Sequence, residues 1–287
     1  MMNLSNYKTL GVINRTPDSF SDIGASLKPD YFQKQLQSFL ADTTIIIDVG
    51  FESTAPMNRP ITHAEELFRF EKFLEASKDF SFEGRFISFD TYKVKNFKYM
   101  VHEFRKYHPK ASFIFNDVSG CLDSELNEAL LEFRGQNFYY IYTFTHIPSR
   151  SKTLEHMKYL NEDFDIIEST ASHFKSAYDW FKTFGMEHQI ILDPGFGFSK
   201  TFDQNWKLIN HFNELEERLL EMKITNPILI GISKKSFLQA ALKTDSDDDV
   251  GGQLEGLHQD CIRKISLNSI MNLLFRVHDP KILSKSL

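Results

Sequence analysis

The apolar positions of the chain gather into eight short runs, and polar or charged residues stand at or just after the end of each run. The runs are Leu10 to Asn14, Ile45 to Asp48, Phe86 to Asp90, Phe113 to Asn116, Phe138 to Thr143, Ile190 to Asp193, Ile228 to Ser233 and Leu273 to Arg276. Continuous apolar runs of this length are typical of strands buried on both faces of a parallel sheet. Helical stretches alternate with them, so the pattern predicts an α/β fold, a (β/α)8 TIM barrel that forms one domain over residues 1–287.

The segments between the runs carry apolar residues at helical spacing. The first, at 29–39, places Phe32 and Leu36 on one stripe, and the second, at 63–76, does the same with Leu67, Phe70 and Leu74. The other predicted helices are 93–107, 124–133, part of 153–184, 205–222, 236–243 and 259–272. Only Pro280 to Leu287 follow the last run, which predicts a very short closing helix.

One acidic stretch, residues 245–252 (DSDDDVGG), interrupts the regular alternation. We interpret it as a solvated loop. A calcium-binding loop is the alternative, but the ligand spacing and the closing Glu of an EF-hand are absent from this stretch.

Composition narrows the functional classes. The chain has 287 residues, of which 41% are hydrophobic, and a formal net charge of −6, which argues against broad binding of nucleic acid. Cys121 and Cys261 lack metal-ligand spacing, so neither a zinc site nor a disulfide framework is expected. Met1 to Lys8 has no apolar signal core and no run of about 18 apolar residues occurs, so we expect a cytoplasmic protein without a membrane partner.

The polar residues at the run ends are the candidate site. Because the carboxyl ends of all barrel strands open onto one face, these side chains are expected to converge. They are Asn14, Asp48, Asp90, Asn116, Asp193, Lys235, Arg276 and His278. Asp and Asn at three strand ends suit a flat heterocycle rich in donors and acceptors, since a carboxylate accepts two parallel N–H bonds. Any one of them equally fits a turn or helix cap, and only their recurrence favours a site.

The last two runs end in cations. Lys235 follows the seventh and Arg276 closes the eighth, in the region where barrel enzymes commonly bind phosphate. Two further loops carry hydroxyl groups suited to anions, one after Asn14 and one after Asp48 with Ser53 and Thr54. The loop after Asn14 (RTPDSFSDIG) either covers a ligand or caps a helix through Thr16 or Asp18. Asp48 lies in an otherwise apolar run, so its charge must be paired or protonated.

Seven short motifs occur in a fixed order along the chain. They occupy Asn14 to Gly24, Asp48 to Thr54 (DVGFEST), Asp90 to Lys93 (DTYK), Asn116 to Gly120 (NDVSG), Asp193 to Lys200 (DPGFGFSK), Ser233 to Ser236 (SKKS) and Arg276 to Asp279 (RVHD). This series resembles the dihydropteroate synthases, the pterin-binding barrel enzymes of folate biosynthesis, and spans nearly the whole chain. The resemblance implies a transferase that condenses 6-hydroxymethyl-7,8-dihydropterin pyrophosphate with 4-aminobenzoate, yielding 7,8-dihydropteroate and pyrophosphate. It also implies Mg²⁺ as cofactor and a homodimer.

The resemblance assigns a role to each matching residue. The pterin would be bound by Asp90, Asn116, Asp193, Lys235 and Arg276, and the pyrophosphate by Asn14, Thr54, Arg276 and His278, with Asn14 also binding the metal. The aminobenzoate would be bound by Pro56, Phe198 and Ser236. The catalytic residues would be Phe20, Asp22, Asp90 and Lys235. The chemistry of these residues is consistent with this reaction, because cations neutralise a departing pyrophosphate and a buried carboxylate stabilises the pterin methylene cation that remains. The arylamine then attacks, so no nucleophilic side chain is required.

The second motif departs from the family pattern. Ala55 stands where the family has Arg, which removes a charge-assisted bond that Arg59 would have to replace, and Phe51 replaces a glycine and is expected to crowd or reshape the loop. Lys234 replaces an Arg before the pterin lysine. Two alternatives therefore stay open: a pterin-binding paralogue with weak or altered activity, and the pterin-binding domain of a methyltetrahydrofolate methyltransferase. The intact TPDSFSD loop and Lys235–Ser236 disfavour the second, and a purely structural barrel would not need the polar run ends.

Overall fold

The eight apolar runs form a closed barrel of parallel strands. The computed structural model describes residues 4–14, 29–53, 59–151, 164–242, 250–267, 269–284 and 286. The strands are β1 (Thr9–Asn14), β2 (Ile45–Gly50), β3 (Phe86–Asp90), β4 (Ser112–Asp117), β5 (Phe138–Thr143), β6 (Ile190–Asp193), β7 (Ile228–Ile230) and β8 (Leu273–Val277). They are hydrogen-bonded in sequence order, and β8 closes on β1 with Phe275 opposite Thr9. The predicted (β/α)8 architecture is confirmed; the single-domain assignment over residues 1–287 stays a prediction.

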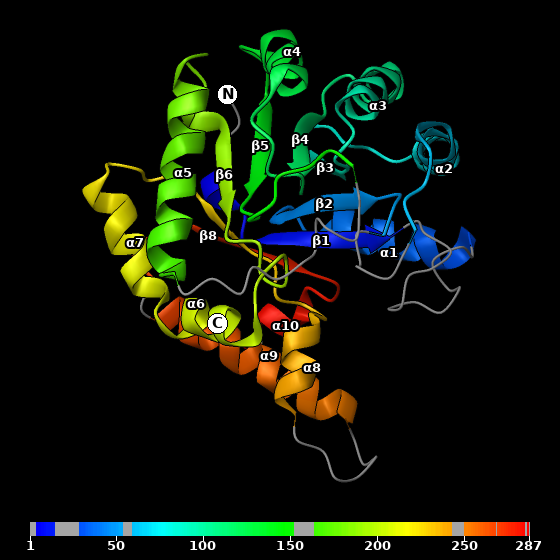
Figure 1. Ribbon diagram of the computed structural model, residues 1–287. Coiled ribbons are helices and arrows are strands. Elements are labelled where there is room, and N and C mark those ends of the chain that lie inside the picture. The colour runs from blue at the N-terminus through cyan, green and yellow to red at the C-terminus, as the bar shows by residue number, and fades with distance from the viewer. Residues whose placement is uncertain are drawn as a thin grey trace.

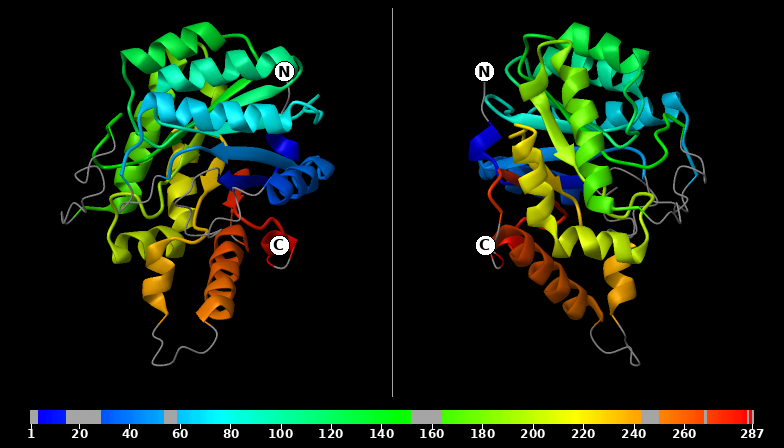
Figure 2. Two further views of the ribbon diagram at one scale, coloured as in Figure 1. Left: turned by 90° about the vertical axis from the view of Figure 1, so that its right-hand side faces the viewer. Right: turned by 60° about the vertical axis from the view of Figure 1, so that its left-hand side comes forward.

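Helices surround the barrel, as Figures 1 and 2 show. They are α1 (Pro29–Ala41), α2 (His63–Ser77), α3 (Val94–Tyr107), α4 (Ser124–Phe133), α5 (Ile166–Lys182), α6 (Phe202–Asn210), α7 (Phe212–Glu221), α8 (Ser236–Ala241), α9 (Val250–Leu267) and α10 (Lys281–Ser284), with short 3-10 turns at Leu4–Asn6 and Glu187–Gln189. The expected short closing helix is α10. Among the described residues, none of these helices has the length and apolar character that crossing a membrane requires.

Two helix predictions were wrong in their bounds. The helix expected at 205–222 is broken at His211, which separates α6 from α7. The helix expected at 259–272 is α9, which begins at Val250 and ends at Leu267, so the final residues of the acidic stretch belong to a helix; 245–249 lie outside the described residues. The physical reason is burial, because Leu254 and Leu257 pack against the core two turns and one turn before the buried Cys261.

Four helices that follow strand ends begin at a capping side chain, among them α5, where Asp165 accepts from the Ile167 and Glu168 amides. Thr62 accepts from the Glu65 amide ahead of α2, and Asp123 accepts from the Leu126 amide ahead of α4. Thr201 forms a reciprocal capping box with Gln204 ahead of α6. Each cap contributes about 1 kcal/mol and fixes the point at which a strand-end loop stops and a helix begins.

Inside the barrel, the inward positions change from apolar to polar along the strands. One layer is wholly apolar and consists of Leu10, Ile46, Phe86, Ile114, Ile141, Ile191, Leu229 and Leu274, with Leu4 and Tyr7 packed against it. Two residues further along, on the same face of each strand, stand Val12, Asp48, Ser88, Asn116, Thr143, Asp193, Gly231 and Arg276. Asp48 is therefore an interior residue and does not end its strand as expected, since β2 continues to Gly50. The barrel interior is therefore mostly polar near the carboxyl ends of the strands.

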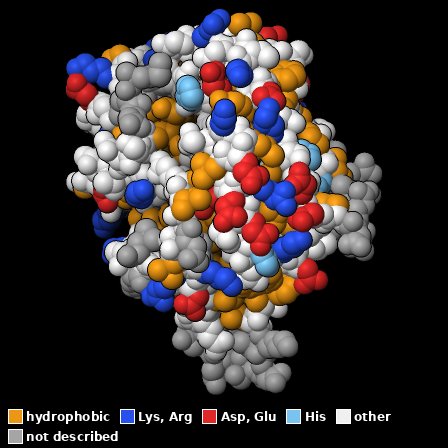
Figure 3. Space-filling model, turned by 90° about the vertical axis from the view of Figure 1, so that its left-hand side faces the viewer, with side chains coloured by type: hydrophobic (Ala, Val, Ile, Leu, Met, Phe, Trp, Pro, Cys, Tyr) orange, Lys and Arg blue, Asp and Glu red, His pale blue; other side chains and the backbone are white. Residues whose placement is uncertain are grey.

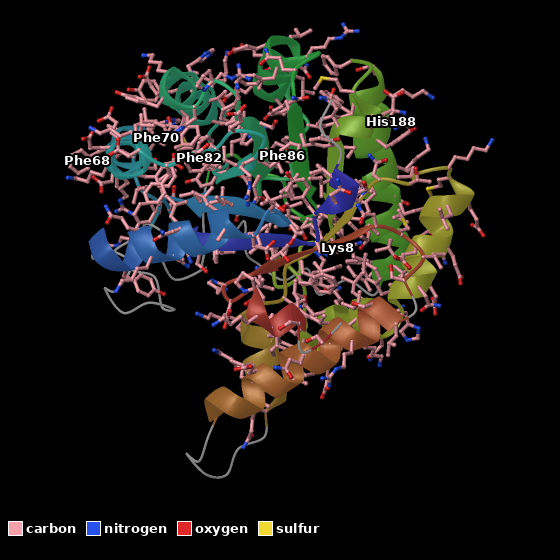
Figure 4. The ribbon with its side chains drawn as sticks, turned by 180° about the vertical axis from the view of Figure 1, so that it is seen from behind. Lys8, Phe68, Phe70, Phe82, Phe86 and His188 are labelled. Carbon is pink, nitrogen blue, oxygen red and sulfur yellow. The ribbon has the colours of Figure 1, made fainter. Side chains whose placement is uncertain are left out.

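Between barrel and helices lies an aromatic layer. The Phe97 and Phe115 rings stack at 4.2 Å, and Phe51 packs edge-on against Phe70 and Phe73, each at 5.7 Å. Phe51 is fully buried in this layer with its ring against α2, and its predicted effect on the shape of the following loop stays a prediction, since residues 54–58 lie outside the described residues. Figure 4 shows Phe70 on the inner side of α2 and Phe68, which is 53% exposed, on the outer side.

The side of the molecule formed by α5 and α7 carries acidic and basic side chains interspersed (Figure 3). Arg218 pairs with Glu168, and Lys207 lies 3.3 Å from Asp165. Charges of both signs in alternation are typical of a solvated surface, and exposed pairs of this kind contribute about 0–1 kcal/mol each.

Candidate functional site

Arg276 is the centre of the polar interior. From β8 its Nε donates to Asp48 Oδ2 on β2 at 2.7 Å, and its Nη2 donates to Asp90 Oδ2 on β3 at 2.7 Å. Asp48 has no exposed surface, and its other oxygen accepts from Ser88 Oγ at 2.6 Å and from Asn116 Nδ2 at 3.1 Å. One guanidinium and two carboxylates thus connect β2, β3, β4 and β8, and the predicted convergence of Asp48, Asp90, Asn116 and Arg276 is confirmed.

Asp90 keeps one oxygen without a partner. Its Oδ1 is buried and has no hydrogen bond within the described part of the chain. Burial raises the pKa of Asp90 to about 7; Arg276 opposes this, and the nearby Asp48 adds to it. A carboxyl group that titrates near neutral pH can accept or donate a hydrogen bond to a ligand.

Asn14 lies beside Asp90 at the end of β1. A Cβ added at Gly50 would stand 3.5 Å from Asp90 Oδ2 and 3.6 Å from Asn14 Oδ1, so both oxygens flank the space that this glycine leaves open. An amide oxygen next to a carboxylate is the kind of oxygen-donor set that Mg²⁺ prefers. Among the described residues no three His, Cys, Asp or Glu side chains are grouped to hold a metal. The residues therefore fit an ion that a polyphosphate and water mostly coordinate.

A second carboxylate, Asp193, stands at the end of β6. Its Oδ1 accepts from the Gly195 amide at 2.8 Å, and Thr143 Oγ1 lies 3.4 Å from its Oδ2. Burial raises the pKa of Asp193, while the Gly195 amide and Lys235 oppose the shift. This carboxylate is held by a backbone amide, which fixes its orientation independently of the Arg276 network.

Lys235 and Phe198, to which the resemblance assigns different substrates, are in contact. The Lys235 ammonium lies 4.1 Å from the centroid of the Phe198 ring, a cation–π contact. A Cβ on Gly197 would stand 3.1 Å from Lys235 Cδ, so a glycine there leaves room for the lysine stem. Burial and then Arg276 lower the pKa of Lys235 to about 8. Ser236 follows as the first, exposed residue of α8.

His278 completes the end of β8. Its Nδ1 lies 3.0 Å from Ser233 Oγ, so the hydroxyl holds the imidazole ring in one orientation. Burial first, and then the positive charges of Lys234 and Arg276, lower the pKa of His278 to about 3. The ring is therefore neutral at pH 7 among three cationic side chains after β7 and β8, where the sequence predicted a phosphate site.

Several residues that shape the rim were missed from the sequence. Tyr92 joins Val118 and Phe198 in an apolar cluster drawn from the loops after β3, β4 and β6. The Tyr92 hydroxyl donates to Glu52 Oε1 at 3.1 Å, and Lys93, which belongs to the DTYK motif, pairs with Glu52 at 2.5 Å. The charged residues of two motifs therefore meet each other. Their spacing in the sequence carried no signal of this pairing.

Arg150 is the second residue that was missed. Its guanidinium donates to Asp117 at 2.8 Å, to Asp123 at 2.6 Å and to the Tyr92 carbonyl at 3.0 Å. It thereby connects the loops after β3, β4 and β5. Since Asp117 is fully buried, this guanidinium neutralises a charge that would otherwise be costly.

Some predicted site residues cannot be placed. Phe20, Asp22, Thr54, Ala55 and Pro56 lie outside the described residues. Arg59, considered as a replacement for the missing arginine, is exposed in the segment leading to α2.

Comparison with known proteins identifies similar chains. A protein-family model described as pterin binding enzyme matches residues 10–258. A dihydropteroate synthase of Clostridium beijerinckii is 28% identical over 246 residues, which cover 85% of this chain and 80% of that protein. A mitochondrial bifunctional folate synthesis protein of Arabidopsis thaliana is 30% identical over 235 residues, 80% of this chain but only 40% of that protein. This chain therefore corresponds to less than half of the bifunctional relative.

The fold has solved counterparts. A dihydropteroate synthase of Clostridium difficile, crystallised in the presence of pteroic acid, superposes with a TM-score of 0.71 at 26% identity. The superposition covers 98% of this chain and 94% of that one.

Proposed function

Because this chain belongs to the pterin-binding enzyme family, as its match over residues 10–258 shows, we propose that it is a dihydropteroate synthase. It would condense 6-hydroxymethyl-7,8-dihydropterin pyrophosphate with 4-aminobenzoate and release pyrophosphate. The observation that carries this proposal is the Arg276 network. It fixes Asp90 and Asn116 at the barrel mouth and leaves one buried Asp90 oxygen for a ligand.

The pterin would lie between two preorganised carboxylates. Asp90 and Asp193 are each oriented by a fixed donor, Arg276 for the first and the Gly195 amide for the second. A pterin presents an amino-pyrimidine edge with neighbouring N–H donors, which match carboxylate oxygens. Asn116 is held by its bond to Asp48, so its carboxamide needs no reorganisation when the ligand binds.

The pyrophosphate would lie against the cationic side of the mouth. Arg276 and Lys235 supply positive charge, and His278 supplies a neutral hydrogen-bonding ring. Mg²⁺ would be held with Asn14 and, when bound, would neutralise negative charge on the leaving group. These charges are in place before reaction, so the protein spends little reorganisation energy when the bond breaks.

The reaction would exchange one bond at the pterin methylene carbon. The carbon–oxygen bond to pyrophosphate breaks, and the electron pair leaves with the oxygen. The carboxylates of Asp90 and Asp193 stabilise the positive charge that develops on the pterin. The 4-aminobenzoate nitrogen then forms the new bond and loses a proton. Phe198 and Ser236, with Pro56, would line the arylamine side.

The test measures pyrophosphate release with and without 4-aminobenzoate, in the wild type and in Ala55→Arg. Release that is coupled to formation of dihydropteroate supports the proposal. Restoring the arginine should raise kcat/KM by about 10- to 100-fold, because a charge-assisted bond contributes about 1.5–3 kcal/mol. If the pterin pyrophosphate neither reacts nor raises the melting temperature, the proposal fails.

One alternative is favoured by a specific feature. Ala55 favours a pterin-binding paralogue with weak or altered activity, and pyrophosphate release without incorporation of 4-aminobenzoate would identify it. The homodimer and the cytoplasmic location stay predictions.

A further inference from the structure

Lys200 is a buried cation to which no step of the reaction assigns a role. It closes the DPGFGFSK motif and has 1% of its surface exposed. Its Nζ donates hydrogen bonds to three backbone carbonyls and not to a carboxylate: those of Phe144 at 3.0 Å, Gly195 at 3.1 Å and Phe198 at 3.3 Å. The Phe144 ring lies 4.3 Å from the ammonium and adds a cation–π contact.

Two of these carbonyls belong to one tight turn after β6. The Phe198 amide donates to the Gly195 carbonyl at 2.9 Å, which closes the turn over residues 195–198. The residue that follows the turn, Ser199, has φ of 49°, a region that non-glycine residues rarely adopt, so the exit from the turn is costly to form. A Cβ at Gly195 would stand only 2.2 Å from the Phe144 carbonyl oxygen, so the turn presses against the end of β5. The three carbonyl oxygens converge on one buried position, where the Lys200 ammonium supplies their donor.

The other side of the same turn faces the site. The Gly195 amide orients Asp193, and the Phe198 ring lies beneath the Lys235 ammonium. Gly197 passes under the stem of Lys235, and its amide donates to Asn205 Oδ1 at 2.8 Å. A shift of the turn would therefore move the carboxylate Asp193, the aromatic ring and the lysine together.

We propose that Lys200 is a positioning residue, whose ammonium holds the turn 195–198 against the end of β5 and thereby places the Phe198 ring against Lys235. Its effect on the arylamine substrate rests on the proposed function, because Phe198 lines that part of the mouth. Its effect on the turn does not rest on the proposed function, because Lys200 holds the turn in the protein without substrate.

The first experiment compares hydrogen exchange of backbone amides in the wild type, Lys200→Met and Lys207→Met. Methionine keeps the length of the side chain but removes the charge and the donors. Lys207 is the control, because it lies on α6 and its ammonium pairs with the exposed Asp165. We expect exchange in residues 195–200 to rise by at least about tenfold in Lys200→Met alone, since local opening becomes easier there. Unchanged exchange, or an equal rise throughout the barrel, would overturn the proposal.

The second experiment separates positioning from general stability by kinetics. In Lys200→Met the KM for 4-aminobenzoate should rise about tenfold. The Kd for the pterin pyrophosphate should rise by a smaller factor, about threefold, because Asp193 and Lys235 move with the turn while Arg276 still holds Asp90 and Asn116. Equal losses for both substrates would contradict the assigned role. If the wild type forms no dihydropteroate, the proposed function fails while the exchange experiment still decides the role of Lys200. If Lys200→Met does not fold, Lys200→Gln, which is shorter and uncharged, takes its place. Exchange at the wild-type rate in residues 195–198 of that variant would also overturn the proposal.

Discussion

The substitution Arg276→Met tests the network that organises the site. It removes the donors of the two 2.7 Å bonds to Asp48 and Asp90 and leaves two buried carboxylates without their shared counter-charge. Removing one partner of a buried ion pair costs about 3–5 kcal/mol, because the remaining charge stays desolvated. Ser88 and Asn116 still donate to Asp48, so we expect a loss of about 3 kcal/mol, at the lower end of this range.

Urea unfolding of the ligand-free protein at pH 7 and pH 5 measures this loss. Burial already raises the pKa of Asp90 to about 7, and without the opposing charge of Arg276 this pKa lies further above its unfolded value. Stability is therefore greatest at low pH and is lost as pH rises through the raised pKa, so the deficit of the variant should shrink at pH 5. Asp48→Asn in the Arg276→Met background should recover part of the loss. Arg263→Met, at an exposed pair with Asp260, should cost less than about 1 kcal/mol.

Three results would refute this reasoning. They are a loss below about 1 kcal/mol for Arg276→Met, a deficit that grows at pH 5, and additive losses in the double variant.

Three further predictions follow from single residues. Gly195→Ala should destabilise the fold by at least about 2 kcal/mol in urea unfolding, since its φ is 68° and its Cβ would meet the Phe144 carbonyl at 2.2 Å; near-wild-type stability would contradict this. The pKa of His278 is about 3, well below the unfolded value, so its contribution is present above pH 6.5 and decreases as pH falls. This group should account for up to about 2 kcal/mol of the stability that the wild type loses between pH 7 and pH 5, and His278→Gln should lack that part of the loss. An unchanged dependence of stability on pH in the variant would exclude this. Chelating Mg²⁺ should abolish condensation, and adding Mg²⁺ back should restore it. Asn14→Ala should raise the Mg²⁺ concentration that condensation requires. Activity that does not change with the chelator would rule the metal out.

The barrel could be predicted because its signal is local and repeated. Each apolar run is a buried strand, and residues two apart share a face, so the inward series Phe86, Ser88, Asp90 is already present in the sequence. The convergence of Asp90, Asn116 and Arg276 followed from this repetition. The exact strand ends did not, and β2 extends past Asp48 because Val49 and Gly50 also pair with β3.

The supporting residues could not be predicted, since loop geometry decides their partners. Lys93 lies 41 positions from Glu52, and Arg150 lies 33 positions from Asp117, yet both pairs are in contact. The side on which Phe51 lies depended on the turn after β2. The family pattern has a glycine at this position, which says nothing of where a phenylalanine ring lies, and the backbone turns the ring toward α2.

The most direct test of the central claim follows carbon-labelled 4-aminobenzoate into dihydropteroate by the purified chain, in the wild type and in Asp193→Asn. The account predicts one pyrophosphate released for each labelled dihydropteroate formed, and a rate at least about 100-fold lower in the variant, because a preorganised carboxylate then no longer stabilises the pterin cation. Equal rates in both proteins, or no product and no thermal shift with the pterin pyrophosphate, would contradict it.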